Sequence, residues 1–188
     1  MVQKICVLFV VLLAFGSSTV DASPSTEREP FEIGYLRHGY KSVNQAVKEC
    51  EQHFNRNIKL PIKLPQITFT HQLARCNNGS AHVDINSELE IEYLNENKGS
   101  NHYQIWVKPA GKKFSGVPFK NDVIETFTLK DGTKAIFGTT PAISGKKPIA
   151  NLLVFERDYL QYILSVDTRM EDSVSVNVLL EIAESIIN

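Results

Sequence analysis

Residues 123–139 read VIETFTLKDGTKAIFGT. Two runs rich in β-branched and aromatic residues flank Asp131-Gly132, and Asp-Gly between two such runs is a strong signal of a β-hairpin. We therefore expect paired antiparallel strands over residues 123–130 and 133–139.

Strand-like patterns continue on both sides of this hairpin. Five further segments are rich in apolar, β-branched and aromatic residues: 67–76, 88–93, 102–108, 149–157 and 159–166. The last two lie on either side of Asp158 and read as a second hairpin. The chain is therefore expected to form an antiparallel sheet of about seven strands.

One of these strands carries three regularly spaced glutamates. Leu89, Ile91 and Tyr93 alternate with Glu88, Glu90 and Glu92. A period of two predicts a half-buried strand. We expect the glutamates on a solvated face, opposite lysines of a neighbouring strand.

A helix is expected at each end of this sheet. Ser42 can cap the first, with Gln45 completing a capping box, and Pro61 and Pro65 prevent its continuation. Its apolar stripe is Val43, Ala46, Val47, Cys50 and Phe54. The second begins near Ser175 and has Leu179, Ile182, Ala183 and Ile186 on one face. The prediction is a single α+β domain over 37–188, with both helices on one face of the antiparallel sheet.

The first residues have the pattern of a secretory signal peptide. Lys4 precedes the apolar run Ile5–Phe15, and small residues follow up to Ala22. A charged start, a short apolar run and a small-residue exit are the parts of such a signal, and the run is shorter than the about 20 residues of a membrane span. We expect residues 1–22 to be removed between Ala22 and Ser23, residues 23–36 to form a loose polar leader, and the mature chain to be secreted or extracytoplasmic.

Cleavage would remove Cys6 and leave Cys50 and Cys76. Two cysteines in an exported chain are candidates for a disulfide bond, because an oxidising compartment lets the bond persist. Two separately buried thiols are the alternative, and the sequence leaves both open.

Composition narrows the function classes. The 188 residues are 43% hydrophobic and 22% charged with a net charge of −1, which indicates a globular chain with no overall field that would recruit nucleic acid. The sequence has no phosphate loop, zinc motif or nucleophile elbow. The histidines at 38, 53, 71, 82 and 102 fall on separate segments. We therefore expect no catalytic residues, no metal and no cofactor, and a monomer that does not bind nucleic acid.

Two lysine pairs are the candidate binding feature. Lys112 and Lys113, and Lys146 and Lys147, lie in the two long loops between expected strands. In an up-and-down meander both loops leave the sheet at one end, so the pairs would share a rim with Lys108 and Lys120, flanked by Phe114 and Phe119. Such a rim fits an anionic polymer such as wall teichoic acid, or a membrane surface. Ordinary solubility lysines, with the phenylalanines packed beneath them, are the alternative.

Several fold motifs together resemble a known family. They are Ser42–Ala46, the paired Leu-Pro segment Leu60–Pro65, the strand Leu89–Tyr93, the hairpin Leu129–Gly138, the segment Leu152–Leu164 and the closing helix Ile182–Ile186. In this order they resemble secreted domains of unknown function from Gram-positive, Bacillus-type bacteria, which also occur in lipoproteins and in the extracellular parts of anti-sigma-factor-like proteins. Asp158-Tyr159 stands where that family usually has Gly at the last hairpin. The resemblance implies an extracytoplasmic sensing or binding module and transfers no catalytic residue.

Three functional hypotheses follow from these patterns. The first is a secreted, non-enzymatic binding or sensing domain that contacts anionic cell-envelope material. The second is a protein-binding or envelope assembly factor, which an exposed apolar patch around Trp106 would favour. The third is an exported hydrolase whose site assembles from distant residues, which a cleft with convergent His, Asp or Glu side chains would favour.

Overall fold

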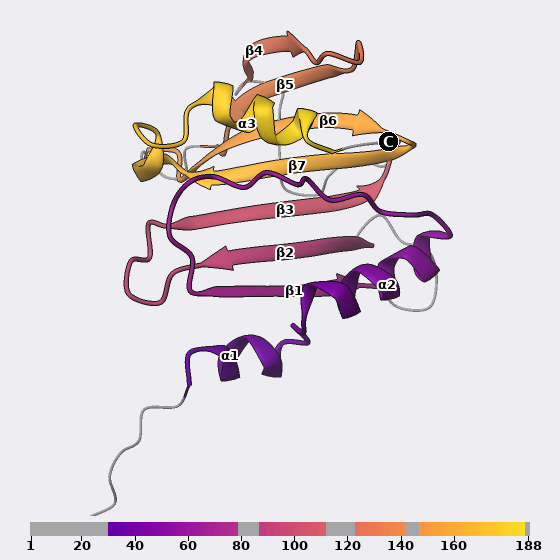
Figure 1. The fold of residues 1–188 in the computed structure, drawn as a ribbon, viewed down its shortest axis with the longest axis vertical. Helices are drawn as coiled ribbons and strands as arrows, with labels where there is room; N and C mark the ends of the chain where they lie inside the picture. The colour runs from indigo at the N-terminus through magenta and orange to yellow at the C-terminus, as the bar shows by residue number, and fades with distance from the viewer. Residues whose placement is uncertain (1–29, 79–86, 112–122, 142–146, 187–188) are drawn as a thin grey trace, which may run out of the picture.

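A computed structural model describes residues 30–78, 87–111, 123–141 and 147–186 of the chain (Figure 1). The predicted signal peptide, residues 1–22, and leader residues 23–29 lie outside the described residues. Within the described part, no helix is long and apolar enough to cross a membrane.

The predicted antiparallel sheet is confirmed. Its seven strands lie in the order β1-β2-β3-β7-β6-β5-β4, and every neighbouring pair is antiparallel. The strands are β1 His71–Asn77, β2 Glu88–Leu94, β3 His102–Pro109, β4 Val123–Thr128, β5 Lys134–Thr139, β6 Ala150–Arg157 and β7 Leu160–Asp167.

The expectation of a simple meander is wrong. The chain leaves β3 in the middle of the sheet and forms β4 at the far edge, and β5, β6 and β7 then return until β7 pairs with β3 (Figure 1). Local turn signals favour the β4–β5 and β6–β7 hairpins. The β3–β7 pairing joins segments that are distant in sequence, so no local signal reports it.

Both principal helices cover the same face of the sheet, as predicted. Helix α2, Val43–Phe54, packs over β1 and β2, and helix α3, Val176–Glu184, lies over β6 (Figure 1). The chain from α2 to β1 crosses this face between them, and Ile58 on this segment is buried. All three join one apolar core with the inward-facing strand residues, which include Ile91, Ile105 and Leu164.

Two local expectations near the first helix are wrong. The short helix α1, Glu32–Arg37, occupies residues expected to be a loose leader. Phe31, just before α1, contacts the ring of His71, and Tyr35 of α1 contacts the ring of Tyr40. These contacts hold the segment on the domain. At Ser42 the hydroxyl donates to the Gln45 side chain at 2.9 Å instead of forming the backbone half of a capping box.

Arg157 holds the C-terminal end of the chain on the sheet. Its side chain is 8% exposed, and its guanidinium pairs with Asp131 of the β4–β5 turn at 2.5 Å. It also donates to the carbonyl oxygens of Ala183 and Ile186 at the end of α3, at 3.1 and 2.8 Å. These bonds satisfy carbonyls that a helix end otherwise leaves without partners.

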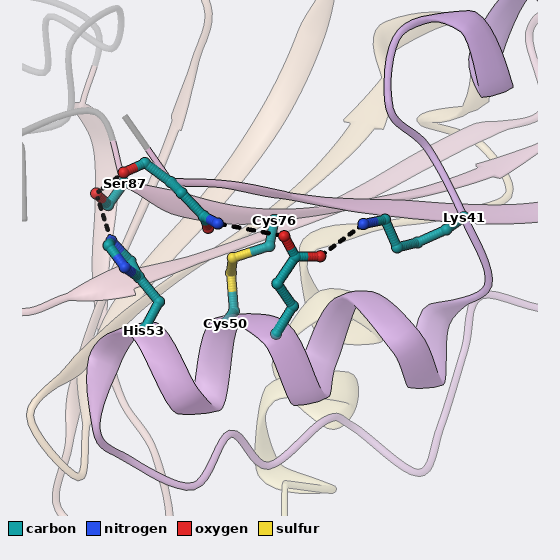
Figure 2. Close-up of a disulfide and its surroundings, with 7 residues drawn as sticks. Lys41, Cys50, His53, Cys76 and Ser87 are labelled. Carbon is teal, nitrogen blue, oxygen red and sulfur yellow. Dashed lines mark hydrogen bonds and ion pairs between the residues drawn. A yellow bond between two sulfur atoms is a disulfide. The ribbon is translucent and has the colours of Figure 1, made fainter. Parts of the chain in front are cut away.

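A disulfide bond joins Cys50 of α2 to Cys76 of β1, with the two sulfur atoms 2.01 Å apart (Figure 2). Cys50 is fully buried on the apolar stripe of the helix. Lys41 pairs with Glu49 at 2.6 Å on one side of the bond, and His53 hydrogen-bonds Ser87 at 3.0 Å on the other (Figure 2). The helix is therefore held on the edge of the sheet by a covalent bond and by polar contacts.

Replacing both cysteines by alanine is expected to lower the free energy of unfolding by about 2–4 kcal/mol, because the unfolded chain regains the entropy of the closed loop. Urea denaturation of wild type and the double variant, both without reductant, measures the difference. Reduced wild type should approach the variant, and an unchanged midpoint in the variant would contradict a stabilising role for the bond.

Candidate functional site

An open surface depression of about 720 Å³ lies where the C-terminal end of α2 meets the β6–β7 hairpin. We call it the hairpin pocket. Its volume falls within the about 300–1,000 Å³ of small-molecule sites. The described residues that line it are Glu51, Gln52, Asn55, Arg56, Asn57, Lys59, Asp158 and Tyr159.

The backbone of the hairpin pocket is unusual. Asn55, Asp158 and Tyr159 have φ of 51°, 51° and 61°, and they are the non-glycine residues with positive φ in the described part of the chain. Asn55 ends α2 in the left-handed conformation, a position that asparagine tolerates. Asp158 and Tyr159 form a two-residue turn that requires positive φ at both positions and usually contains glycine. A bulky residue such as tyrosine is an outlier there.

The strained turn presents an aromatic ring to solvent. The Tyr159 side chain is 76% exposed. The guanidinium of Arg56 lies 4.9 Å from the ring centroid, a cation–π contact that restrains the ring on one side. The turn therefore holds a tyrosine in an exposed and oriented position.

Side-chain amides share the lining of the hairpin pocket with this ring. Gln52, Asn55 and Asn57 are exposed, and no described residue forms a hydrogen bond with their side chains. Each side-chain amide has two N–H donors and a carbonyl oxygen that can accept two hydrogen bonds. These groups are therefore available to a ligand in the hairpin pocket.

The charged groups of the hairpin pocket balance one another. Lys59 pairs with Asp158 at 3.5 Å, and Glu51 accepts a hydrogen bond from the backbone N–H of Ile58 at 2.9 Å. With Arg56, the lining has two cationic and two anionic side chains. Its described lining contains no histidine, serine or cysteine.

The lysine rim is not assembled by the described residues. Lys112, Lys113 and Lys146 lie outside them, as do Phe114, Phe119 and Lys120. Lys147 is exposed just before β6. Lys108 was expected on the rim, but it lies within β3 and is 2% exposed, because its side chain belongs to a buried face of the sheet.

The flanks of the two lysine loops also lie at opposite ends of the sheet. Ala110, after β3, donates its N–H to the carbonyl of Tyr159 at 2.8 Å, so the first loop leaves at the β6–β7 hairpin. Lys147 precedes Ala150, which pairs with Asp167 at the other end of the same strands. The shared rim rested on the meander, and the long crossover after β3 removes that basis.

The prediction that the β2 glutamates lie on a solvated face is also wrong. Glu90 and Glu92 are 8% and 5% exposed. Glu90 pairs with Arg75 at 2.6 Å, while Glu92 accepts hydrogen bonds from Gln104 at 2.6 Å and contacts His102. The alternation correctly separates the two faces of β2, but both faces are covered.

The segment before α2 contributes to that cover. Lys41 pairs with Ala74 at the β1 edge, and the adjacent Tyr40 is buried with its hydroxyl 3.5 Å from Glu92. Arg75 lies 4.7 Å from the centroid of the Tyr40 ring. Burial, followed by the nearby Glu90 and Glu92, raises the pKa of Tyr40. A contact between residues this far apart in sequence leaves no trace in the strand pattern.

The histidines do not converge. His53 contacts Ser87, His102 contacts Glu92, and His71 lies 3.5 Å from both Glu32 and Glu96. His82 lies outside the described residues. Among the residues that the structure describes, no group of three or more His, Cys, Asp or Glu side chains is placed to hold a metal ion.

An exposed apolar patch around Trp106 would favour the protein-partner hypothesis, and the surroundings of this residue bear on it. Trp106 is half-buried and packs against Leu152, Val154 and Ile163, which are buried on the sheet face opposite α2 and α3. This indole therefore belongs to a second apolar cluster.

Sequence reasoning missed the hairpin pocket. Its one local signal is Asp158-Tyr159, a turn without glycine between two strands, because the turn geometry favours glycine at those positions. The remaining lining comes from the end of α2 and the residues after it, and only the folded chain brings them to the hairpin.

No family model, curated protein or solved structure matches this chain. The resemblance to secreted Bacillus-type domains therefore stays a prediction, and the site rests on its own geometry.

Lys108 is expected to make stability depend on alkaline pH. Burial lowers its pKa to about 8, although the nearby Glu88 opposes the shift. Between about pH 8 and the ordinary lysine pKa of about 10.4, the unfolded chain holds a proton that the folded chain has lost, so the free energy of unfolding rises with pH. From pH 7 to 9.5 wild type should gain about 1–2 kcal/mol relative to Lys108→Met. Urea denaturation at both pH values measures this, and parallel profiles would contradict it.

Tyr159→Gly is expected to leave the free energy of unfolding within about 1 kcal/mol of wild type. Glycine relieves the left-handed conformation, worth about 1–2 kcal/mol, but it adds unfolded-state entropy of about 0.5–1 kcal/mol and loses the Arg56 contact of about 0.5–1 kcal/mol. Urea denaturation measures the balance. A loss above about 3 kcal/mol would show that Tyr159 has a mainly structural role.

Proposed function

We propose that this protein is a secreted, non-enzymatic extracytoplasmic domain that binds its ligand in the hairpin pocket. The observation that carries the proposal is Tyr159, a largely exposed aromatic residue held at φ 61° in a tight turn. Backbone strain costs about 1–3 kcal/mol and concentrates at functional sites. The Arg56 contact, worth about 0.5–1 kcal/mol, offsets only part of that cost, whereas a ligand that contacts the ring would account for the rest.

The compartment is supported by two independent features. The signal-peptide pattern of residues 1–22 predicts export, and the Cys50–Cys76 disulfide is a bond that persists in oxidising surroundings. The resemblance to secreted sensing and binding modules agrees with this compartment.

A binding role fits the site better than catalysis. Asp158 is paired with Lys59, and one Glu51 oxygen is bonded to the backbone. General acid–base catalysis needs a titratable group within reach of a substrate proton and with a pKa near the working pH. The described lining offers no histidine for that task.

NMR titration of ¹⁵N-labelled protein with an envelope extract of the organism that produces it tests the proposal. We expect amide shifts at Asn55, Arg56, Asn57, Asp158 and Tyr159, and their loss in Tyr159→Gly, because that variant keeps the fold and removes the ring. Absence of shifts anywhere, or shifts confined to other surfaces, would overturn the proposal.

The same spectra distinguish the alternative ligands. Contact with anionic envelope material through Lys112, Lys113, Lys146 and Lys147 predicts shifts near Lys147 that disappear when the four lysines are changed to Gln. A protein partner or assembly factor predicts broad line-broadening over a large surface. A hydrolase predicts new product signals in the extract.

A further inference from the structure

The class of ligand can be narrowed from the chemistry of the hairpin pocket. We infer that the pocket binds a neutral carbohydrate, with one sugar ring stacked on Tyr159 and its hydroxyl groups bonded to the surrounding amides. This inference rests on the proposed function and names the ligand of that site.

The exposed ring of Tyr159 supplies an apolar platform. A sugar ring has one face of C–H groups and a rim of hydroxyl groups. It can therefore cover an aromatic face while its rim stays hydrogen-bonded. Arg56 lies over the Tyr159 ring at 4.9 Å, and the side chain remains 76% exposed. A ring restrained in this way loses little conformational freedom when a ligand stacks on it.

The groups around the platform match hydroxyl groups. A sugar hydroxyl both donates and accepts hydrogen bonds, and a side-chain amide does the same. Gln52, Asn55 and Asn57 place three such amides on the lining, and no described residue bonds their side chains. Glu51 and Asp158 add acceptors, while Arg56 and Lys59 add donors. The lining is therefore mixed in donors and acceptors, as a polyhydroxylated ligand requires.

The charge balance argues against an anionic ligand at this site. Sites for phosphate or carboxylate groups concentrate cationic donors. Here the lining has as many carboxylates as cations, and Lys59 is paired with Asp158 at 3.5 Å. An anion that binds Lys59 would have to compete with Asp158 for it, and the two carboxylates of the lining offset the positive charge of the pocket. A neutral ligand faces neither cost.

Titration of ¹⁵N-labelled full-length mature protein with defined probes tests the inference. The probes are short oligomers of glucose, short oligomers of N-acetylglucosamine, and inorganic phosphate as the anionic comparison. We expect at least one sugar series to shift the amides of the hairpin pocket, with a dissociation constant on the order of 1 mM or tighter. Binding should be unchanged between low and high salt, because screening weakens only charged contacts.

Three variants assign the contact to the ring. Tyr159→Gly should weaken sugar binding about tenfold or more, since the stacking surface is gone. Tyr159→Trp keeps an aromatic platform and should retain binding. Ile149→Ala is the matched control, because Ile149 is 70% exposed at the other end of the strands, and it should bind as wild type does.

The outcomes separate this inference from the proposed function. If envelope extract shifts the pocket amides but neither sugar series does, or if phosphate binds there in a salt-sensitive way, the carbohydrate inference is overturned and the proposed function stands. If neither extract nor sugars shift the pocket amides, both fail. If sugars bind Tyr159→Gly as tightly as wild type, stacking on Tyr159 is wrong.

Discussion

The packing of α2 against the edge of the sheet is the constraint on which the rest of the structure depends. The inward face of α2 carries the buried residues Ala46, Cys50 and Phe54. The disulfide from Cys50 to Cys76 fixes the position of the helix along β1. A crosslink acts mainly by restricting the unfolded chain, and here it also holds the helix against β1 close to the point where Asn55 ends it in the left-handed conformation. That end meets the β6–β7 hairpin and forms one wall of the hairpin pocket.

The two faces of the sheet are buried by different means. One face lies beneath α2, the crossing segment and α3 in a continuous apolar core. The other combines the apolar cluster of Leu152, Val154 and Ile163 with the pairing of Glu90 to Arg75. Buried charges are tolerated when they are paired and hydrogen-bonded, and the contacts of Glu90 and Glu92 meet that condition. These glutamates therefore belong to the framework of the protein.

Strain and exposure coincide at one turn. The hairpin after β6 needs positive φ at both central residues, and Asp158 and Tyr159 adopt it without glycine. The same turn leaves the Tyr159 ring in solvent beside Arg56. A single substitution to glycine would relieve the backbone strain in this turn. The strained turn nevertheless carries an exposed aromatic ring, and this coincidence is the reason to place the binding function there.

Local patterns in the sequence determined the elements of the fold. Asp131-Gly132 and the runs beside it determined one hairpin, the residues around Asp158 a second, and the stripe from Val43 to Phe54 a helix that turns Cys50 inward. The tertiary structure alone decided the β3–β7 pairing, the burial of Glu90, Glu92 and Lys108, and the assembly of the hairpin pocket. The physical reason is that periodicity and turn chemistry act over a few residues, whereas these features depend on contacts between segments that only the folded chain brings together.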